Sequence, residues 1–294
     1  MSASRIGLGL AALGRPGYIN LGHREDLGRH TDISALETRS YEVMDAARAA
    51  GISYFDAARS YGRAEAFLSS WLDSRGIEPG AVAVASKWGY VYTADWRVDA
   101  EQHEVKDLSV ENLRRQAEES RALLGDHLRL YQIHSATLES GVFEDTAVRE
   151  ELDRLRAEGL EIGFTSSGPR QRETIERALE VGGFDAVQAT WNLLERSAGP
   201  ALAAAHEAGL RVIVKEALAN GRLIATVPDA VAMAAALAQP WADVVLSGAA
   251  TVQHVQSNVR ALDVDYDESM DAELAGLVED PESYWSTRAA LAWN

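Results

Sequence analysis

Eight short apolar segments alternate with eight amphipathic helical patterns along the 294-residue chain, and this alternation is the feature that most limits its fold. Short runs rich in aliphatic and β-branched residues are typical of strands, and apolar residues that recur on one face are typical of helices. The predicted strands are residues 6–10, 53–55, 82–86, 130–134, 161–165, 186–188, 212–215 and 244–246. The predicted helices are residues 38–50, 63–74, 110–124, 146–158, 170–181, 200–208, 229–238 and 251–262.

The strand composition favours a closed barrel over an open sheet. Most of the predicted strands are continuous apolar runs, so both of their faces are expected to be buried, as in a parallel sheet covered by helices. An open doubly wound sheet would place a glycine-rich phosphate loop after the first strand, whereas Gly7 and Gly9 lie inside that strand without a third glycine. We therefore predict an α/β fold, a (β/α)8 TIM barrel of eight parallel strands.

The chain shows no proline- or serine-rich linker, so we expect a single domain over residues 1–294. Residues 267–294 are expected to form a C-terminal tail near the barrel mouth, and the polar segment 92–107 is long enough to be a functional loop. Ser109 is expected to cap the helix that follows it, and Gly51, Gly159 and Gly209 are expected to end helices in left-handed geometry.

Composition excludes several classes of function. The 28 Lys and Arg residues stand against 45 Asp and Glu residues, a formal net charge of −17, so a polyanionic partner such as nucleic acid is not expected. The chain has no cysteine, which excludes disulfides, thiolate nucleophiles and cysteine-ligated metals; redox chemistry would require a bound cofactor, and we expect no metal. Its apolar runs are too short to cross a bilayer, which favours a cytoplasmic protein without a membrane partner.

Four chemically suited side chains follow three successive predicted strands. Asp56 and Tyr61 follow the second strand, Lys87 the third, and His134 ends the fourth. Each also fits a structural role when taken singly, but together they would meet at one rim of a barrel, where such folds carry their chemistry. A phenol such as that of Tyr61 has a pKa of about 10, and a nearby ammonium such as that of Lys87 lowers it. An aspartate beside a buried lysine keeps that lysine charged. An imidazole can donate a hydrogen bond to a substrate oxygen and orient it.

These residues resemble the aldo-keto reductase family. Residues 55–62 (FDAARSYG) are similar to the family's FDTA-x-x-YG segment, residues 86–89 to its Ser-Lys strand end, and residues 109–134 to its helix-and-strand block that ends in histidine. The resemblance spans residues 6–262 and implies an NAD(P)-dependent oxidoreductase that transfers a hydride between nicotinamide and the carbonyl or alcohol carbon of an aldehyde, ketone or sugar. It implies Asp56, Tyr61, Lys87 and His134 as the catalytic tetrad, with Tyr61 as the general acid or base.

The resemblance also implies where a dinucleotide would bind, although several positions depart from the family pattern. Thr165 and Ser166 replace Ser and Asn, Trp191 replaces a tyrosine that stacks on nicotinamide, and Lys215 replaces another tyrosine. Lys215 could equally approach a phosphate or pair with a carboxylate. The implied cofactor contacts are Thr165, Ser166, Gln188, Trp191, Lys215, Leu218, Gly221, Gly248, Ala250, His254 and Asn258.

The choice between NAD and NADP stays open at this point. The family favours NADP, but residues 248–250 are Gly-Ala-Ala, where a lysine or arginine would pair with a 2′-phosphate. Only His254, Arg222 and Arg260 lie near that turn in the sequence. We hold both cofactors as candidates.

Aromatic residues provide candidate walls for a substrate pocket, chiefly Tyr18, Trp88 and Trp96. The expected partner is a small carbonyl or alcohol compound. Two other functions fit the same residues: a non-catalytic nicotinamide-binding redox sensor or regulatory subunit, and a lyase in which Lys87 forms a Schiff base with a carbonyl substrate.

Overall fold

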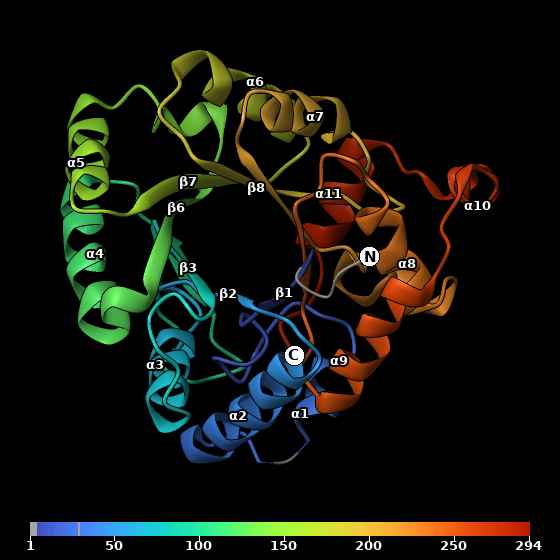
Figure 1. The fold of residues 1–294 in the computed structure, drawn as a ribbon, viewed down its shortest axis with the longest axis horizontal. Coiled ribbons are helices and arrows are strands. Elements are labelled where there is room, and N and C mark those ends of the chain that lie inside the picture. The colour runs from blue at the N-terminus through green and yellow to red at the C-terminus, as the bar shows by residue number, and fades with distance from the viewer. Residues whose placement is uncertain (1–4, 29) are drawn as a thin grey trace.

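The computed structural model describes residues 5–28 and 30–294, and its centre is a closed barrel of parallel strands in the order β1-β10-β9-β8-β7-β6-β3-β2 (Figure 1). This arrangement confirms the predicted (β/α)8 barrel. The barrel strands are β1 (Ile6–Gly9), β2 (Tyr54–Asp56), β3 (Ala83–Trp88), β6 (Leu128–Ala136), β7 (Glu161–Ser166), β8 (Ala186–Thr190), β9 (Arg211–Lys215) and β10 (Val244–Ser247).

Helices surround the barrel and connect successive strands, as Figure 1 shows. These are α2 (Ile33–Ala49), α3 (Ala64–Ser74), α4 (Val110–Leu124), α5 (Thr146–Ala157), α6 (Gln171–Val181), α7 (Gly199–Glu207), α8 (Asp229–Leu237) and α9 (Val252–Val259). The Ser109 side chain accepts a hydrogen bond from the Asn112 backbone at the start of α4, as expected. Gly51, Gly159 and Gly209 adopt φ of 87°, 101° and 90°, which confirms their predicted left-handed conformation.

A small apolar layer packs the interior of the barrel. Glycine allows this packing at β1, because a Cβ atom on Gly7 would lie 2.7 Å from Leu246 and 2.9 Å from Tyr54. The layer consists of Tyr54, Ala85, Leu130, Ala186, Ile213, Val244 and Leu246. Larger cores lie between the barrel and the helices, so the open end of the barrel is the place available for a ligand.

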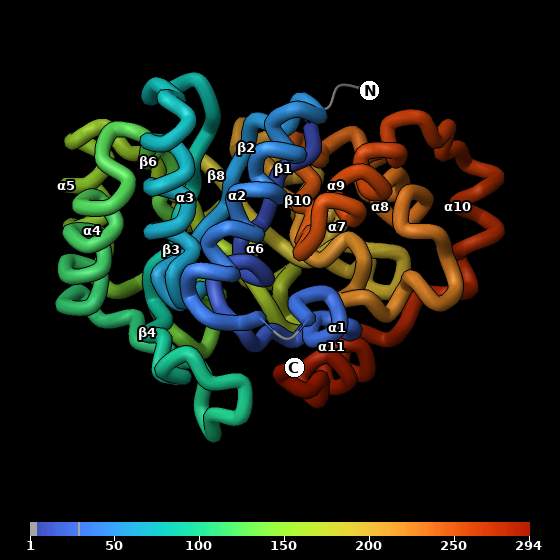
Figure 2. Tube along the Cα trace, turned by 90° about the horizontal axis from the view of Figure 1, so that it is seen from below, coloured from blue at the N-terminus to red at the C-terminus, as the bar shows by residue number. Residues whose placement is uncertain are grey.

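Several elements at that open end were not predicted. Strands β4 (Tyr90–Tyr92) and β5 (Glu104–Lys106) pair as an antiparallel hairpin within the expected functional loop, and helix α1 (His23–Leu27) follows β1. Helices α10 (Glu268–Leu274) and α11 (Pro281–Ala289) form beyond the last barrel unit. Figure 2 shows α1, α11 and β4 at one end of the barrel. Helix α1 and the two hairpin strands are too short for a periodic pattern to reveal them, whereas α10 and α11 fall within the expected C-terminal tail.

None of the helices in the described part of the chain combines the length and the apolar character that a membrane span requires.

Candidate active site

A cavity of about 760 Å³ opens at the end of the barrel where the strands finish. Loops after β1, β2, β6, β7, β9 and β10 line it, together with the β4–β5 hairpin and residues of α11. Tyr61 and His134 lie in its wall, and so do Gly248 and His254 from the last barrel unit. The cavity therefore joins the predicted catalytic residues to the predicted dinucleotide-binding segments.

Asp56, which is part of the cavity wall, forms a buried ion pair with Lys87, which is not. Asp56 is the last residue of β2 and Lys87 lies in the neighbouring strand β3, and their exposed fractions are 2% and 1%. The Lys87 ammonium donates to the Asp56 carboxylate and to the Ala57 carbonyl at 2.9 Å. The other carboxylate oxygen of Asp56 accepts from Gln132 and Gln188 at 3.3 and 3.2 Å, so both charges have several partners.

The Tyr61 ring lies against this ion pair. Lys87 Nζ is 4.9 Å from the Tyr61 ring centroid, in a cation–π arrangement. Burial raises the pKa of the Tyr61 phenol and the Asp56 carboxylate raises it further, while Arg15 acts in the opposite direction. The expectation from the sequence is a lowering by Lys87, so the structure differs in direction because burial and nearby carboxylates dominate.

His134 faces Tyr61 across the cavity wall. The two ring centroids are 5.5 Å apart with an interplanar angle of 82°, and His134 Nδ1 lies 3.5 Å from the Ser60 hydroxyl. Burial, followed by the Lys87 charge, holds the pKa of His134 well below its usual value. The imidazole is therefore neutral at pH 7.

Most of the residues predicted to hold a dinucleotide reach the cavity. Those that line it are Thr165, Gln188, Lys215, Leu218, Gly221, Gly248, His254 and Asn258. Three others do not. Ser166 points to the opposite face of β7 from Thr165 because strand side chains alternate, and Ser167 lines the cavity instead. Ala250 is 2% exposed and lies behind Gly248 and Ala249, which are in the wall.

Trp191 is also placed outside the cavity. It comes directly after β8, and its ring packs edge-on against Trp241 at 5.9 Å and under the Arg196 guanidinium at 5.6 Å. Two other indoles line the cavity, those of Trp285 in α11 and of Trp293. A helix far along the chain thus provides the aromatic surface that the sequence places at Trp191.

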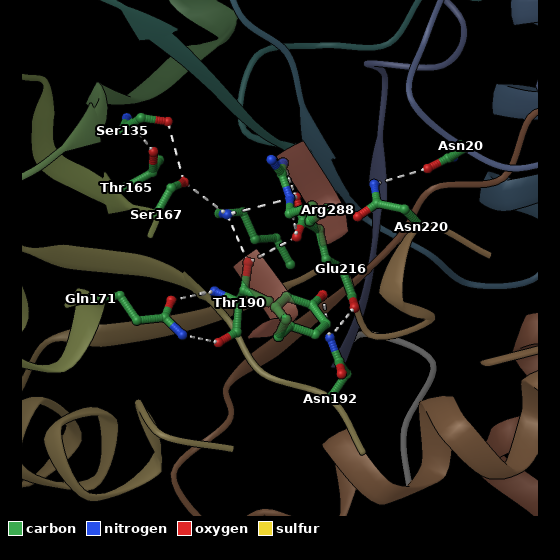
Figure 3. Close-up of polar contacts among 12 residues, drawn as sticks. Asn20, Ser135, Thr165, Ser167, Gln171, Thr190, Asn192, Glu216, Asn220 and Arg288 are labelled. Atoms are coloured by element: carbon green, nitrogen blue, oxygen red, sulfur yellow. Dashed lines mark hydrogen bonds and ion pairs between the residues drawn. The ribbon is translucent and has the colours of Figure 1, made fainter. Parts of the chain in front are cut away.

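A cluster of charged residues, Lys215 at the end of β9, Glu216 and Arg288 of α11, lines the cavity (Figure 3). Lys215 Nζ donates to Thr190 at 2.8 Å and to Ser167 at 3.2 Å, and lies 3.8 Å from the Glu216 carboxylate. Burial lowers the Lys215 pKa to about 8. Arg288 of α11 binds Glu216 through Nε at 2.9 and 3.0 Å.

The charge on Glu216 is well compensated. Burial opposes its ionisation, but Arg288 and Lys215 outweigh that effect and lower its pKa to about 2. Arg288 lies closer to the Glu216 carboxylate than Lys215 does. The Lys215 ammonium therefore stays available at the cavity wall. No sequence pattern indicates Arg288, since it lies far from every motif.

The loops after β1 and β9 meet across the cavity. Asn220 Nδ2 donates to Asn20 Oδ1 at 3.1 Å, and the Leu21 amide donates to the Asn220 carbonyl at 3.0 Å (Figure 3). Gly221 has φ of 88°, and a Cβ atom there would come within 3.2 Å of the Leu21 side chain, so glycine is required at this crossing. Residues from both sides of this crossing line the cavity.

The end of the cavity near α9 is acidic. Asp26 and Asp229 line it, and Asp26 Oδ1 lies 3.6 Å from His254 Nε2. The other cations considered from the sequence are engaged elsewhere: Arg222 pairs with Glu279 at 2.5 Å, and Arg260 donates to Ser257 at 2.7 Å. The carboxylates at this end carry no sequence signature: Asp26 belongs to the short helix α1, and Asp229 is the first residue of α8.

The aromatic residues predicted for a substrate pocket are divided by the structure. Tyr18 lines the cavity, whereas Trp88 is fully buried in the core between barrel and helices. Trp96 packs on Phe67 at 6.4 Å and donates to the Thr31 carbonyl at 2.7 Å, outside the cavity. Tyr90 of the hairpin and Trp293 complete the aromatic wall beside Tyr61.

Comparison with known proteins agrees with this geometry. The family model "Aldo/keto reductase family" matches residues 5–229. The chain is similar to PA4992 of Pseudomonas aeruginosa, a protein assigned to the aldo-keto reductases, at 25% identity and a TM-score of 0.66 over 92% of this chain and 90% of that one. The search of curated proteins found no match.

Two further solved structures share the fold. The aldo-keto reductase AKR11C1 from Bacillus halodurans has 19% identity and a TM-score of 0.70, covering 94% of this chain and 92% of its own. The glycerol dehydrogenase AKR11B4 from Gluconobacter oxydans has 18% identity and a TM-score of 0.69, covering 93% and 90%. With the family model matched over most of the barrel, the chain belongs to the aldo/keto reductase family of oxidoreductases, which use nicotinamide cofactors.

Proposed function

We propose that this protein is an NAD(P)H-dependent oxidoreductase that interconverts a carbonyl compound and its alcohol, with Tyr61 as the proton donor and acceptor. The observation that carries the proposal is the convergence of Asp56, Tyr61, Lys87 and His134 at one cavity. Asp56, Tyr61 and His134 line the cavity, but the Asp56 carboxylate is bound by Lys87, Gln132 and Gln188. We therefore assign proton exchange with a substrate oxygen to Tyr61, with His134 beside it.

Tyr61 and His134 have different roles at the substrate oxygen: Tyr61 transfers the proton and His134 orients the oxygen. The bound nicotinamide supplies or accepts the hydride. The Tyr61 phenol gives a proton to the carbonyl oxygen in reduction and takes it back in oxidation, and the nearby Lys87 charge stabilises the phenolate form. A Ser60 hydroxyl that donates to His134 Nδ1 leaves the ring proton on Nε2, where it can donate to the same substrate oxygen and orient it.

The cavity wall fits a dinucleotide. The ammonium of Lys215 borders it, Gly221 and Gly248 bring backbone close to its surface, and the buried Asn220 Oδ1 in the wall accepts no hydrogen bond from the described residues. The first turn of α9 adds backbone N–H groups as possible donors to a polar group of the cofactor. These features suit a pyrophosphate with polar groups on either side.

For the cofactor we propose NAD rather than NADP. Asp26 and Asp229 would repel a 2′-phosphate, whereas a carboxylate can accept hydrogen bonds from ribose hydroxyls. His254, the one cation candidate at this end that lines the cavity, is already beside Asp26. For the substrate we propose a small aldehyde, ketone or sugar held between the aromatic walls of Tyr18, Tyr90 and Trp293.

The deciding experiment compares Tyr61→Phe with Tyr18→Phe, because both remove a phenol from the cavity wall. We expect Tyr61→Phe to reduce turnover of a panel of aldehydes, ketones and aldoses by at least about 10³-fold while NADH and NADPH still bind, and Tyr18→Phe to change mainly KM. Full turnover in Tyr61→Phe would refute the role of Tyr61. Borohydride trapping of a lysine adduct would instead support Schiff-base chemistry.

A further inference from the structure

Arg15 lies beside Tyr61 and belongs to none of the motifs considered above. It follows β1, is 2% exposed, and its guanidinium carbon is 5.1 Å from the Tyr61 ring centroid. The same guanidinium lies 5.2 Å from the ring of Tyr18 and 4.7 Å from that of Trp293. A buried cation among three aromatic rings at a reaction site is costly unless other groups hold it there.

Two hydrogen bonds hold Arg15 in this position. Its Nη1 donates to the Ser60 carbonyl at 2.8 Å, which is the carbonyl of the peptide bond that leads into Tyr61. The same nitrogen donates to the Glu104 carboxylate of β5 at 3.0 Å. Arg15 therefore connects the backbone at Tyr61 to the β4–β5 hairpin.

The backbone itself brings Arg15 close to Tyr61. A Cβ atom on Gly14 would lie 2.2 Å from the Tyr61 carbonyl oxygen, and one on Gly62 would lie 2.4 Å from the Gly14 carbonyl. The Arg63 amide also donates to the Gly14 carbonyl at 2.7 Å. Only glycines permit the two loops to approach this closely, so the position of Arg15 over Tyr61 is fixed by the main chain.

We propose that Arg15 is a positioning residue for proton transfer, which holds the Tyr61 ring and favours its ionised form, and that Glu104 weakens this effect. The proposal rests on the function proposed for Tyr61. It assigns to the Arg15–Glu104 pair the control of how readily Tyr61 releases its proton.

The charges that face Tyr61 from other elements support this assignment. Lys87 of β3 is paired directly with Asp56 of β2, so its charge is largely compensated, and His134 of β6 is neutral. Burial and the carboxylates of Asp56, Glu104 and Glu216 raise the Tyr61 pKa, and Arg15 opposes them. The second phenol in the wall, Tyr18, has a pKa raised by its own burial and so remains neutral.

Removal of Arg15 and removal of Glu104 should affect the ionisation of Tyr61 in opposite directions. This difference distinguishes an electrostatic role from a loss of structure. Removing the Arg15 charge disfavours the phenolate, whereas removing the Glu104 charge leaves Arg15 uncompensated and favours it. A purely structural role would lower activity in both variants without moving the pH profile.

The test measures kcat for alcohol oxidation from pH 7 to 10.5 in Arg15→Met, Arg15→Lys and Glu104→Gln, with Glu101→Gln as the control for an exposed carboxylate in the same hairpin loop. We expect Arg15→Met to shift the rising limb to higher pH, with rates about tenfold lower at a given pH, and Glu104→Gln to raise the rate several-fold. Arg15→Lys should restore much of the wild-type profile.

Unshifted profiles in Arg15→Met or Glu104→Gln, or a shift of Glu104→Gln to higher pH, would overturn the proposal. If Arg15→Met does not fold, Arg15→Lys and Glu104→Gln still decide it, because Glu104→Gln keeps the cation in place. The role of Tyr61 in proton transfer is tested separately. If Tyr61→Phe retains turnover, that role is wrong, whatever the Arg15 and Glu104 variants show.

Discussion

Lys87 Nζ lies 4.9 Å from the ring centroid of Tyr61, yet its hydrogen bonds go to Asp56 and to the Ala57 carbonyl. The ammonium therefore acts on the phenol through its field across the ring face. Since Asp56 compensates that charge and burial disfavours the phenolate, the site holds Tyr61 in its protonated form. A protonated phenol is ready to donate to a carbonyl oxygen, which is the requirement of reduction.

This protonation state predicts different pH profiles for the two directions. The Tyr61 pKa is raised above its usual value and that of His134 is well below its own, so neither group titrates between pH 7 and 9. We expect kcat for carbonyl reduction to be level over this range and kcat for alcohol oxidation to rise with pH, because oxidation needs the phenolate. Steady-state kinetics at saturating cofactor test this. A bell-shaped optimum near pH 7 for reduction would contradict it.

The buried ion pair predicts strong coupling between its members. Lys87→Met would leave the Asp56 charge buried without its cation, at a cost of about 3 kcal/mol or more in the free energy of unfolding. Lys87→Met combined with Asp56→Asn should recover part of that loss, since the remaining amide can share hydrogen bonds with Gln132 and Gln188. The coupling energy is measured by urea unfolding of the native protein, the two single variants Lys87→Met and Asp56→Asn, and the double variant.

The control for this cycle is Arg97→Met, which breaks an ion pair whose side chains are 64% and 81% exposed. Because solvent screens this pair, Arg97→Met should change the free energy of unfolding far less than Lys87→Met does. If the losses in the free energy of unfolding caused by Lys87→Met and Asp56→Asn simply add in the double variant, the two charges do not stabilise each other.

The sequence predicts the barrel and the strand-end residues well because both depend on local pattern. Asp56 and Lys87 end or lie within short apolar runs, and adjacent parallel strands place such ends together. Positions that depend on the course of a loop were less predictable. Ser166 is one residue out of phase with the cavity, and Trp191 turns away after β8.

The rest of the site comes from segments that no local pattern connects. Arg15 is placed by the close contact of Gly14 with Tyr61, and Arg288 by the docking of α11 over the strand ends. Asp26 belongs to a helix of only five residues. Tertiary packing, which one sequence does not reveal, determines all three positions.

The acidic end of the cavity predicts the cofactor preference. We expect NADH to bind more tightly than NADPH, and Asp26→Asn to move the ratio of their dissociation constants toward NADPH by roughly fivefold, about 1 kcal/mol. Removal of the carboxylate also frees His254 to approach a 2′-phosphate. Fluorescence titration with both cofactors measures the ratio, and Glu25→Gln is the control because that neighbouring carboxylate is exposed and outside the cavity wall. Preference for NADPH in the native protein would refute the assignment.

His23 predicts a loss of stability in acid. Its side chain is fully buried and lies edge-on to the Tyr18 ring. Burial, reinforced by Arg15, lowers its pKa to about 4, against about 6.5 in the unfolded chain. Between these two pH values the unfolded state binds one more proton than the folded state. The contribution of His23 to stability is therefore full above pH 6.5 and decreases toward pH 4, by about 3 kcal/mol at most.

His23→Leu should remove this part of the pH dependence of the free energy of unfolding, measured with urea at pH 7.5, 5.5 and 4.5. The exposed His30→Gln is the control. An unchanged slope in His23→Leu would mean that other groups cause the acid sensitivity.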